Sequence, residues 1–263
     1  AGLDVYENPI DNHDYIICVD VSRGLAQDYS AFVIIDITHA PWKLVAKYRN
    51  KDIRPMLFPN VIYNVATNYN NAHVLIEVND IGEAVAASLY YDVEYENVLM
   101  CAMRGRSGQV VGQGFSGNKV QMGVKMSKTV KAQGCSNLKT LIEDDKLLVK
   151  DYNIVSELTT FIQVKQSFEA DEGYNDDLVM CLVIFAWLVQ QEYFKEMTDQ
   201  DIRRRIYEEQ KNAIEQDMAP FGFIDDGLEQ EQEIDSQGNI WRIDMNEENQ
   251  EKWKLDEYGD MAS

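Results

Sequence analysis

The sequence has few of the residues that form disulfide frameworks and zinc sites. It contains only four cysteines and three histidines in 263 residues. No two cysteines show a Cys-x-x-Cys spacing and no histidine clusters with them; the cysteines are Cys18, Cys101, Cys135 and Cys181. Three of the four lie in apolar runs. We therefore expect buried free thiols, as in an intracellular protein, and no structural zinc.

Positive charge and long hydrophobic runs are also scarce. The 24 Lys and Arg residues face 45 Asp and Glu residues, which gives a formal net charge of −21. This balance disfavours a general polyanion-binding surface, so any contact with nucleic acid must come from a local basic patch. The longest apolar run, 178–189, has 12 residues, which suits a buried helix rather than a membrane span. We expect no signal peptide and no membrane partner.

Apolar periodicity predicts the order of the secondary structure elements. The runs at 15–21 and 31–37 predict a β-hairpin, and 43–49 predicts a third antiparallel strand. Residues 103–127 contain six glycines without a clear period, which predicts a long functional loop or a flexible hairpin. The other expected elements are helices at 56–70, 81–91, 128–144 and 177–196, strands at 73–78, 97–102 and 146–151, and a helix passing into a strand at 155–164.

This order favours an α/β protein with an RNase H-like fold, the fold of the resolvase and integrase superfamily. Three antiparallel strands, then helix, strand, helix and strand, predict a mixed β-sheet flanked by helices. We expect a linker at 1–13, the RNase H-like domain at 14–224 and an acidic extension at 225–263. The extension has 13 acidic residues and three basic ones, which is typical of a solvated tail or a partner-binding segment rather than a second folded domain. A charged helix is expected at 199–217.

Two acids interrupt apolar strands. Asp20 lies in IICVDVS and Glu77 lies in HVLIEVND. Burying a lone carboxylate costs several kcal/mol unless something compensates for it. In this fold the two strands are neighbours, so the two carboxylates would lie side by side and raise each other's pKa. A divalent cation removes that penalty, and oxygen ligands favour Mg²⁺ or Mn²⁺.

A third acidic contribution comes from GYNDDLVM, where Asp176 and Asp177 begin the most apolar helix. Capping explains one of them, because a carboxylate on the first turn interacts favourably with the helix dipole and Asn175 or Asp176 fits the N-cap. Acids in the order strand, strand, helix are harder to explain by capping. They favour phosphodiester hydrolysis with two metal ions about 3.5–4 Å apart, which needs no nucleophilic side chain. The lack of a Ser-His-Asp or Cys-His arrangement therefore does not exclude an enzyme.

Basic residues gather in one segment of this acidic chain. Seven lie within 36 residues and no acid follows them until Glu143; they are Arg104, Arg106, Lys119, Lys125, Lys128, Lys131 and Lys139. The segment follows the strand after Glu77, so we expect it to contact DNA phosphates. Contacts to the backbone alone give little sequence specificity. The alternative is an ordinary solvated loop and helix face.

Four segments, in order, carry a resemblance to a known family. VDVSRGLAQDYSAFVIID, LIEVND and EGYNDDLVMCLVIFAWL resemble the C-terminal nuclease domain of the large terminase subunit of T-even-like tailed bacteriophages. GVKMSKTVKAQGCSNLKTLIEDDKLLVKDYNIVSELTTF is similar to that family's Lys-bearing helix, short strand and Glu-Leu-x-x-Phe element. The resemblance covers about residues 14–195. It implies a metal-dependent endonuclease that cuts concatemeric viral double-stranded DNA at the start and end of headful packaging.

The resemblance also implies site residues. The first acid matches Asp20, the second matches Glu77, and the third falls in the Asp176–Asp177 pair, with Asp177 favoured. Asn175 stands where the family often has His, so no role of that His carries over. Arg23 stands where relatives carry an acid, which puts loop contributions to the metal site in doubt. Asp28 in the same loop fits a turn better than a metal ligand.

The remaining implications concern cofactors and partners. The resemblance implies two Mg²⁺ or Mn²⁺ ions, a packaging ATPase domain in the same full-length chain, a portal, a small terminase subunit and the host cell cytoplasm. The sequence contains no GxxxxGK[ST] motif, so we expect the nuclease module without the motor. Two alternatives remain open: a branched-DNA resolvase or transposase-like nuclease, and a non-catalytic packaging module whose acidic tail binds the portal or another packaging protein.

Overall fold

The computed structural model describes residues 2–23, 29–103, 108–112, 120–164, 167–199, 207, 232–234 and 240–242. The chain divides into two compact units, Ala1–Ile206 and Tyr207–Ser263. In the second unit, β12 (Gln232–Ile234) and β13 (Ile240–Arg242) form an antiparallel pair. The charged helix expected at 199–217 lies almost entirely outside the described residues, and the domain boundary expected at 224 stays a prediction.

The first unit is built on a mixed sheet with the strand order β1-β4-β3-β2-β5. Neighbours pair antiparallel except β2 and β5, which are parallel. The strands are β1 (Leu3–Val5), β2 (Tyr15–Asp20), β3 (Ser30–Asp36), β4 (Trp42–Asn50) and β5 (His73–Ile76), and β9 (Leu147–Leu148) pairs with the start of β4. The predicted mixed sheet is confirmed. In addition, β1 lies in the segment that the sequence predicts to be a linker.

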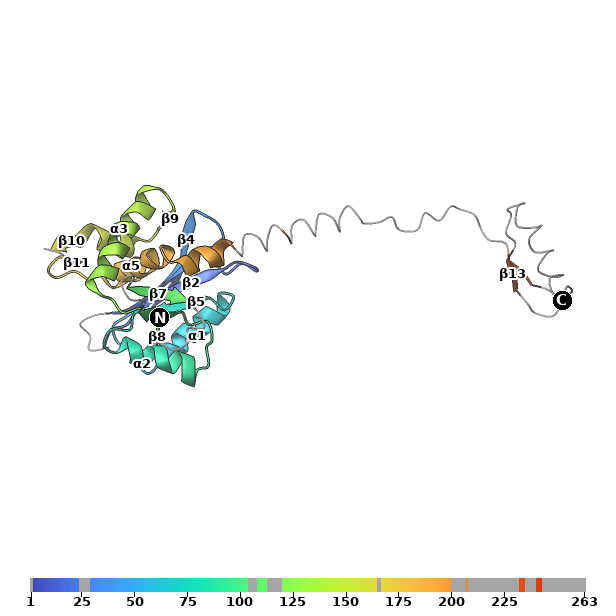
Figure 1. Cartoon of the computed structure of the whole chain (residues 1–263), viewed down its shortest axis with the longest axis horizontal. Helices are drawn as coiled ribbons and strands as arrows, with labels where there is room; N and C mark the ends of the chain where they lie inside the picture. Colours follow the sequence, from blue (N-terminus) through green and yellow to red (C-terminus); the bar gives the residue numbers. More distant parts are fainter. Residues whose placement is uncertain are drawn as a thin grey trace. The chain divides into compact units, whose positions relative to one another are not determined.

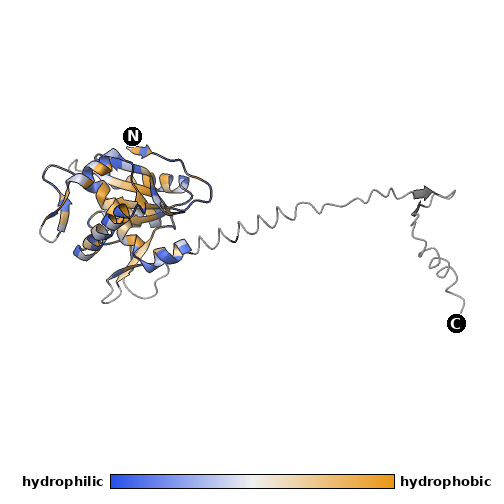
Figure 2. Ribbon diagram, turned by 90° about the horizontal axis from the view of Figure 1, so that it is seen from above, coloured by the Kyte–Doolittle hydropathy of each residue, from blue (hydrophilic) through white to orange (hydrophobic). Residues whose placement is uncertain are grey.

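Helices cover both faces of this sheet, as Figure 1 shows. Successive side chains of a strand point to opposite faces, so Ile16 and Cys18 join one buried core and Ile17 and Val19 join the other. The first core includes α3 (Lys128–Glu143) and α5 (Asp177–Val189); the second includes α1 (Phe58–Asn68) and α2 (Gly82–Ala87). The hydrophobic residues concentrate in the interior of the first unit (Figure 2). Asp20 continues the alternation of Ile16 and Cys18 and therefore faces α5.

The predicted helix at 177–196 is interrupted. Helix α5 ends at Val189, and a second helix, Glu192–Asp199, follows with a bend of 76°. Residues Leu178–Leu188 are all buried, because α5 packs between the sheet and α3, which explains its apolar character on every side. Within the described residues no single helix is long and apolar enough to cross a membrane; α5 and its successor meet that criterion only together, as a bent pair.

For 103–127 the sequence left open a long loop or a hairpin, and the described part forms hairpin strands rather than a long loop. The strands β6 (Met100–Met103), β7 (Gln109–Gly112) and β8 (Val120–Met122) form a small antiparallel sheet with the order β7-β6-β8. Strands β7 and β8 have only four and three residues, too few for an apolar period to be visible in the sequence. Both form by pairing with β6. Residues 104–107 and 113–119 lie outside the described residues.

The segment before α5 forms a helix and a hairpin. Helix α4 (Tyr152–Thr160) leads directly into β10 (Phe161–Val164), which pairs with β11 (Ser167–Ala170). The predicted passage from helix to strand at 155–164 is therefore confirmed. The helix expected at 81–91 is α2 followed by a π-helical turn, Ser88–Asp92. All four cysteines are free and buried, as predicted.

Candidate active site

Asp20 and Glu77 lie at the carboxyl ends of two adjacent parallel strands. The last paired residues of β2 and β5 are Val19 and Ile76, and the Glu77 N–H donates to the Val19 carbonyl at 2.9 Å. Asp20 and Glu77 therefore follow in the same register and on the same face. Adjacent strands are about 4.8 Å apart, so the two carboxylates are neighbours, as predicted.

Two glycines fix the backbone around Glu77 by close approach. A Cβ atom at Gly82 would lie 1.9 Å from the Glu77 carbonyl oxygen, and one at Gly123 would lie 2.3 Å from the Ile76 carbonyl oxygen. Gly123 also has a φ of +110°, which disfavours other residues. Val124, next to Gly123, bridges to Glu77. The end of β5 is thus packed closely between the start of α2 and the segment after β8.

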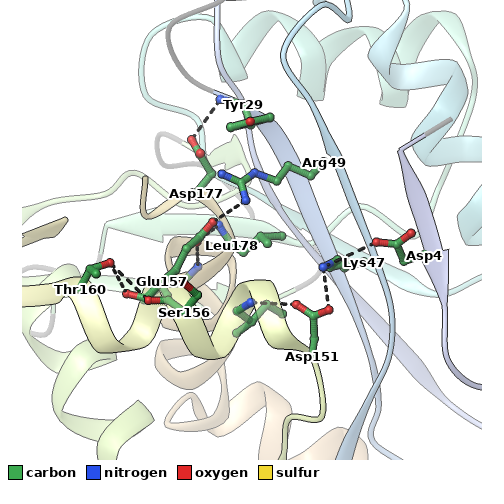
Figure 3. A network of polar contacts seen from close by, with 12 residues as sticks. Asp4, Tyr29, Lys47, Arg49, Asp151, Ser156, Glu157, Thr160, Asp177 and Leu178 are labelled. Atoms are coloured by element: carbon green, nitrogen blue, oxygen red, sulfur yellow. Dashed lines mark hydrogen bonds and ion pairs between the residues drawn. The ribbon is translucent and has the colours of Figure 1, made fainter. Parts of the chain in front are cut away.

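The third acidic element, the start of α5, joins the same place. Asp177 is the first residue of α5 and is buried, whereas Asp176 is partly exposed at the N-cap position. The Asp176 side chain makes no capping hydrogen bond, so capping does not account for its presence. The Tyr29 backbone N–H donates to Asp177 Oδ1 at 3.3 Å, as Figure 3 shows.

These acids form one electrostatic group, which we call the acidic cluster: Asp20, Glu77, Asp176 and Asp177. Burial raises the pKa of Asp20 well above its ordinary value, and the charges of the other three carboxylates raise it further. Burial also raises the pKa of Glu77 to about 7, with Asp176 adding to the shift. Lys131 opposes the shift at both groups. The structure therefore brings together all four acids that the sequence singles out.

The basic residues predicted to contact DNA divide into three groups. Arg104, Arg106 and Lys119 lie outside the described residues. Lys125 and Lys128 are exposed. Lys131 on α3 is partly buried, and its charge acts on both Asp20 and Glu77. It therefore lies beside the acidic cluster, unlike the exposed Lys125 and Lys128.

Two further basic residues, Lys139 and Arg23, have acidic partners in the structure. Lys139 is exposed and pairs with Glu143 one helical turn away, at 3.7 Å. The guanidinium of Arg23 binds the Asp80 carboxylate. A hollow of about 590 Å³ beside the end of β5 is lined by Asp80, Glu83 and Lys125, among others. Arg23 thus extends toward the rim of this hollow.

The sequence assigns no role to one acid of the site, Glu157, although it is the Glu of the Glu-Leu-x-x-Phe element. Its Oε2 accepts hydrogen bonds from the backbone N–H groups of Leu178 at 3.0 Å and Val179 at 3.2 Å. Its Oε1 lies 3.0 Å from Arg49 Nη1 (Figure 3). Burial raises the pKa of Glu157 to about 7, although the Arg49 charge opposes the shift. The signal for it was its spacing of three residues from Ile154, which places both on the buried face of one helix.

The acidic cluster fits divalent metal ions by its chemistry. It supplies carboxylate oxygens, the ligands that Mg²⁺ and Mn²⁺ prefer, and a cation there would lower the raised pKa values of Asp20 and Glu77. As the described side chains stand, no three His, Cys, Asp or Glu residues are arranged to hold an ion.

Comparisons with known proteins agree with this architecture. Residues 17–199 match the model of a family described as the terminase RNaseH-like domain. The large terminase nuclease of thermophilic phage G20c is similar in its magnesium-bound form, with a TM-score of 0.54 and 23% identity over 73% of this chain and 89% of that one. Its cobalt-bound form gives a TM-score of 0.53 and 24% identity over the same shares.

A second solved protein has the same fold. The large terminase nuclease domain of Thermus phage P74-26 matches with a TM-score of 0.51 and 23% identity, over 70% of this chain and 84% of that one. The matched range, 17–199, includes all four acids of the acidic cluster and all of α5. This chain belongs to the family of terminase RNaseH-like domains.

Proposed function

We propose that this chain is a metal-dependent endonuclease that cuts concatemeric viral double-stranded DNA during headful packaging. The observation that carries the proposal is the convergence of Asp20, Glu77 and the Asp176–Asp177 pair from two strands and one helix. Burial, with repulsion from the neighbouring acids, raises the pKa of Asp20 and Glu77, so a bound cation would be needed to keep both side chains ionised. Perturbed carboxylates of this kind mark functional sites.

The carboxylates of the acidic cluster would hold two Mg²⁺ or Mn²⁺ ions. When bound, such ions polarise the scissile phosphate and supply a hydroxide at neutral pH. Asp177 is favoured over Asp176 as a ligand because it is buried and its carboxylate is already oriented by Tyr29 N–H. The magnesium-bound and cobalt-bound nucleases of phage G20c support a divalent ion at this fold.

Lys131 is assigned to the phosphate at the reaction centre. Its charge acts on Asp20 and Glu77, so in the presence of DNA it would bind a phosphate oxygen and offset the charge that develops there. Lys125 and Lys128 would bind neighbouring phosphates, and Arg104, Arg106 and Lys119 belong to the same proposed DNA surface. Contacts of this kind position the duplex without reading its sequence.

The same proposal places the domain in a larger machine. The full-length chain would carry a packaging ATPase domain and would work with the portal and the small terminase subunit in the host cell cytoplasm. Membership of the terminase family supports this setting.

Incubation with supercoiled plasmid and Mg²⁺ or Mn²⁺ tests the proposal. The wild-type protein is expected to nick and linearise the plasmid, while Asp20→Asn and Glu77→Gln do neither. Glu83→Gln is the matched control, because it removes an exposed carboxylate from α2 nearby and should cut like the wild type. Failure of the wild type to cut with either ion, or equal cutting by all variants, would refute the proposal. A preference for four-way junctions over linear duplex would indicate a resolvase instead.

A further inference from the structure

Strand β4 presents two basic side chains on the face of the sheet that carries Asp20. Asp20 pairs with Ala31, and Ala31 pairs with Arg49, so these three residues form one row across β2, β3 and β4. Arg49 therefore lies two strands from Asp20, about 10 Å away in the sheet, and points to the same face. Lys47, two residues earlier on β4, also points to this face.

From Arg49, one chain of contacts reaches the start of α5 through Glu157. The Arg49 guanidinium lies 3.0 Å from Glu157 Oε1. The other carboxylate oxygen of Glu157 accepts hydrogen bonds from the backbone N–H groups of Leu178 and Val179. Glu157 thereby caps α5, which the Asp176 side chain does not do. These two amides follow Asp177 directly. Glu157 thus determines where the first turn of α5 lies and where the Cα atom of Asp177 is held.

A second chain of contacts reaches the Asp177 carboxylate through Tyr29. The guanidinium carbon of Arg49 lies 3.7 Å from the centre of the Tyr29 ring, a stacking contact typical of arginine. The backbone N–H of Tyr29 donates to Asp177 Oδ1. Figure 3 shows Arg49 between Tyr29 and Glu157, with Asp177 beside them. The two routes therefore start at one guanidinium and end at one carboxylate.

From this arrangement we infer that Arg49 and Glu157 are positioning residues that hold Asp177 at the acidic cluster. The inference deepens the proposed nuclease function and depends on it for its consequence in catalysis. A metal ligand has to be held within about 0.5 Å of its productive place by residues that are themselves fixed. Loss of such supporting contacts typically weakens metal affinity or activity by about 10- to 100-fold.

The same strand and helix provide a matched control. Lys47 Nζ lies 2.7 Å from Asp151 Oδ2, and both side chains are buried. Asp151 accepts a hydrogen bond from the Ile154 N–H and caps α4 rather than α5. Removing Lys47 breaks a buried ion pair between β4 and α4, as removing Arg49 does, but it leaves the capping contacts of α5 in place.

The test compares Glu157→Ala, Glu157→Gln, Arg49→Met and Lys47→Met in the whole chain, at a temperature at which circular dichroism shows each to be folded. Three quantities are measured: kcat and KM for plasmid cleavage, the Mn²⁺ dissociation constant by calorimetry, and amide hydrogen exchange at Leu178 and Val179. Calorimetry and exchange do not depend on turnover. Glu157→Gln keeps a carbonyl acceptor for the two amides and serves as the conservative variant if Glu157→Ala does not fold.

We expect Glu157→Ala and Arg49→Met to lower kcat and weaken Mn²⁺ binding by about tenfold or more, with KM for DNA unchanged within about twofold. Glu157→Ala should also speed amide exchange at Leu178 and Val179 by about tenfold, because their acceptor is lost. Glu157→Gln should lie between the wild type and Glu157→Ala in all three quantities. Lys47→Met should keep the wild-type kcat and Mn²⁺ affinity.

The inference and the proposed function fail in different ways. If the wild type cuts DNA and the Arg49 and Glu157 variants match it in kcat and Mn²⁺ affinity, the inference is overturned and the function stands. If Lys47→Met loses as much kcat and Mn²⁺ affinity as Arg49→Met, the inference is also overturned. The loss would then follow from breaking any buried ion pair on β4. If the wild type does not cut, the proposed function fails, and unchanged amide exchange in Glu157→Ala would overturn the positioning as well.

Discussion

Replacing Glu77 by Gln is expected to stabilise the metal-free protein at pH 8 while it abolishes DNA cleavage. Burial raises the pKa of Glu77 from 4.5 to about 7, so the folded state binds this proton more tightly than the unfolded state. The sign follows directly: the ionised side chain opposes folding, and the free energy of unfolding falls as the pH rises from about 4.5 through about 7. Gln carries no charge and lacks this penalty.

The magnitude follows from the same pKa. The difference between 4.5 and about 7, at about 1.4 kcal/mol per pH unit, corresponds to about 3 kcal/mol at pH 8. Burying the neutral amide of Gln costs about 1 kcal/mol. The net gain is about 2 kcal/mol, or about 6 °C in Tm for a domain of this size. At pH 5 most of the penalty is absent, so the two proteins should be nearly equal in stability.

The assay is urea unfolding followed by circular dichroism at pH 5 and pH 8 in EDTA, repeated at pH 8 with Mn²⁺. Mn²⁺ should stabilise the wild type more than Glu77→Gln, because only the wild type offers the full set of carboxylates. A variant that is less stable than the wild type at pH 8, or a difference that is the same at both pH values, would refute the account of Glu77 as a buried carboxylate in the acidic cluster.

Three further predictions concern packing and DNA contact. Lys47→Met should lower the free energy of unfolding by about 3 kcal/mol or more, because it leaves the Asp151 carboxylate buried without its cation; urea unfolding measures this, and a loss below about 1 kcal/mol would contradict it. Gly134→Ala should destabilise by about 1–3 kcal/mol, since its Cβ atom would lie 2.5 Å from the Val183 carbonyl oxygen where α3 packs on α5; an unchanged thermal melting temperature would contradict this packing. Lys125→Ala and Lys128→Ala should each weaken DNA binding equally for all sequences and reduce the salt dependence of log K by about one, measured by fluorescence anisotropy at several salt concentrations; an unchanged slope would remove that lysine from the DNA surface.

Much of the fold was predictable because its signals are local. The runs around Cys18, Val33 and Leu75 are continuous and apolar, which is typical of central strands covered on both faces. The order of the elements then limits the number of possible topologies. Asp20 and Glu77 were recognisable because an acid in such a run needs a compensating partner. The family is confirmed, whereas the narrower likeness to T-even-like phages stays a prediction.

The parts that were missed depend on contacts between distant residues. The break after Val189 has no glycine or proline to announce it, and apolar residues such as Phe194 continue the pattern beyond it. Glu157 stands in the Glu-Leu-x-x-Phe element, but its role could not be predicted because its partner, Arg49, lies on a strand far earlier in the chain. The cap of α5 was sought in Asn175 or Asp176, its sequence neighbours, whereas it comes from another helix.

The measurement that tests the central claim most directly is a crystal structure of the protein soaked in Mn²⁺, with the ion located by anomalous scattering. The account predicts a peak with carboxylate oxygens of Asp20, Glu77 and Asp177 at about 2.0–2.4 Å, a range typical of hard divalent cations. A peak elsewhere, or carboxylates that stay turned away from a common ion at saturating Mn²⁺, would contradict it.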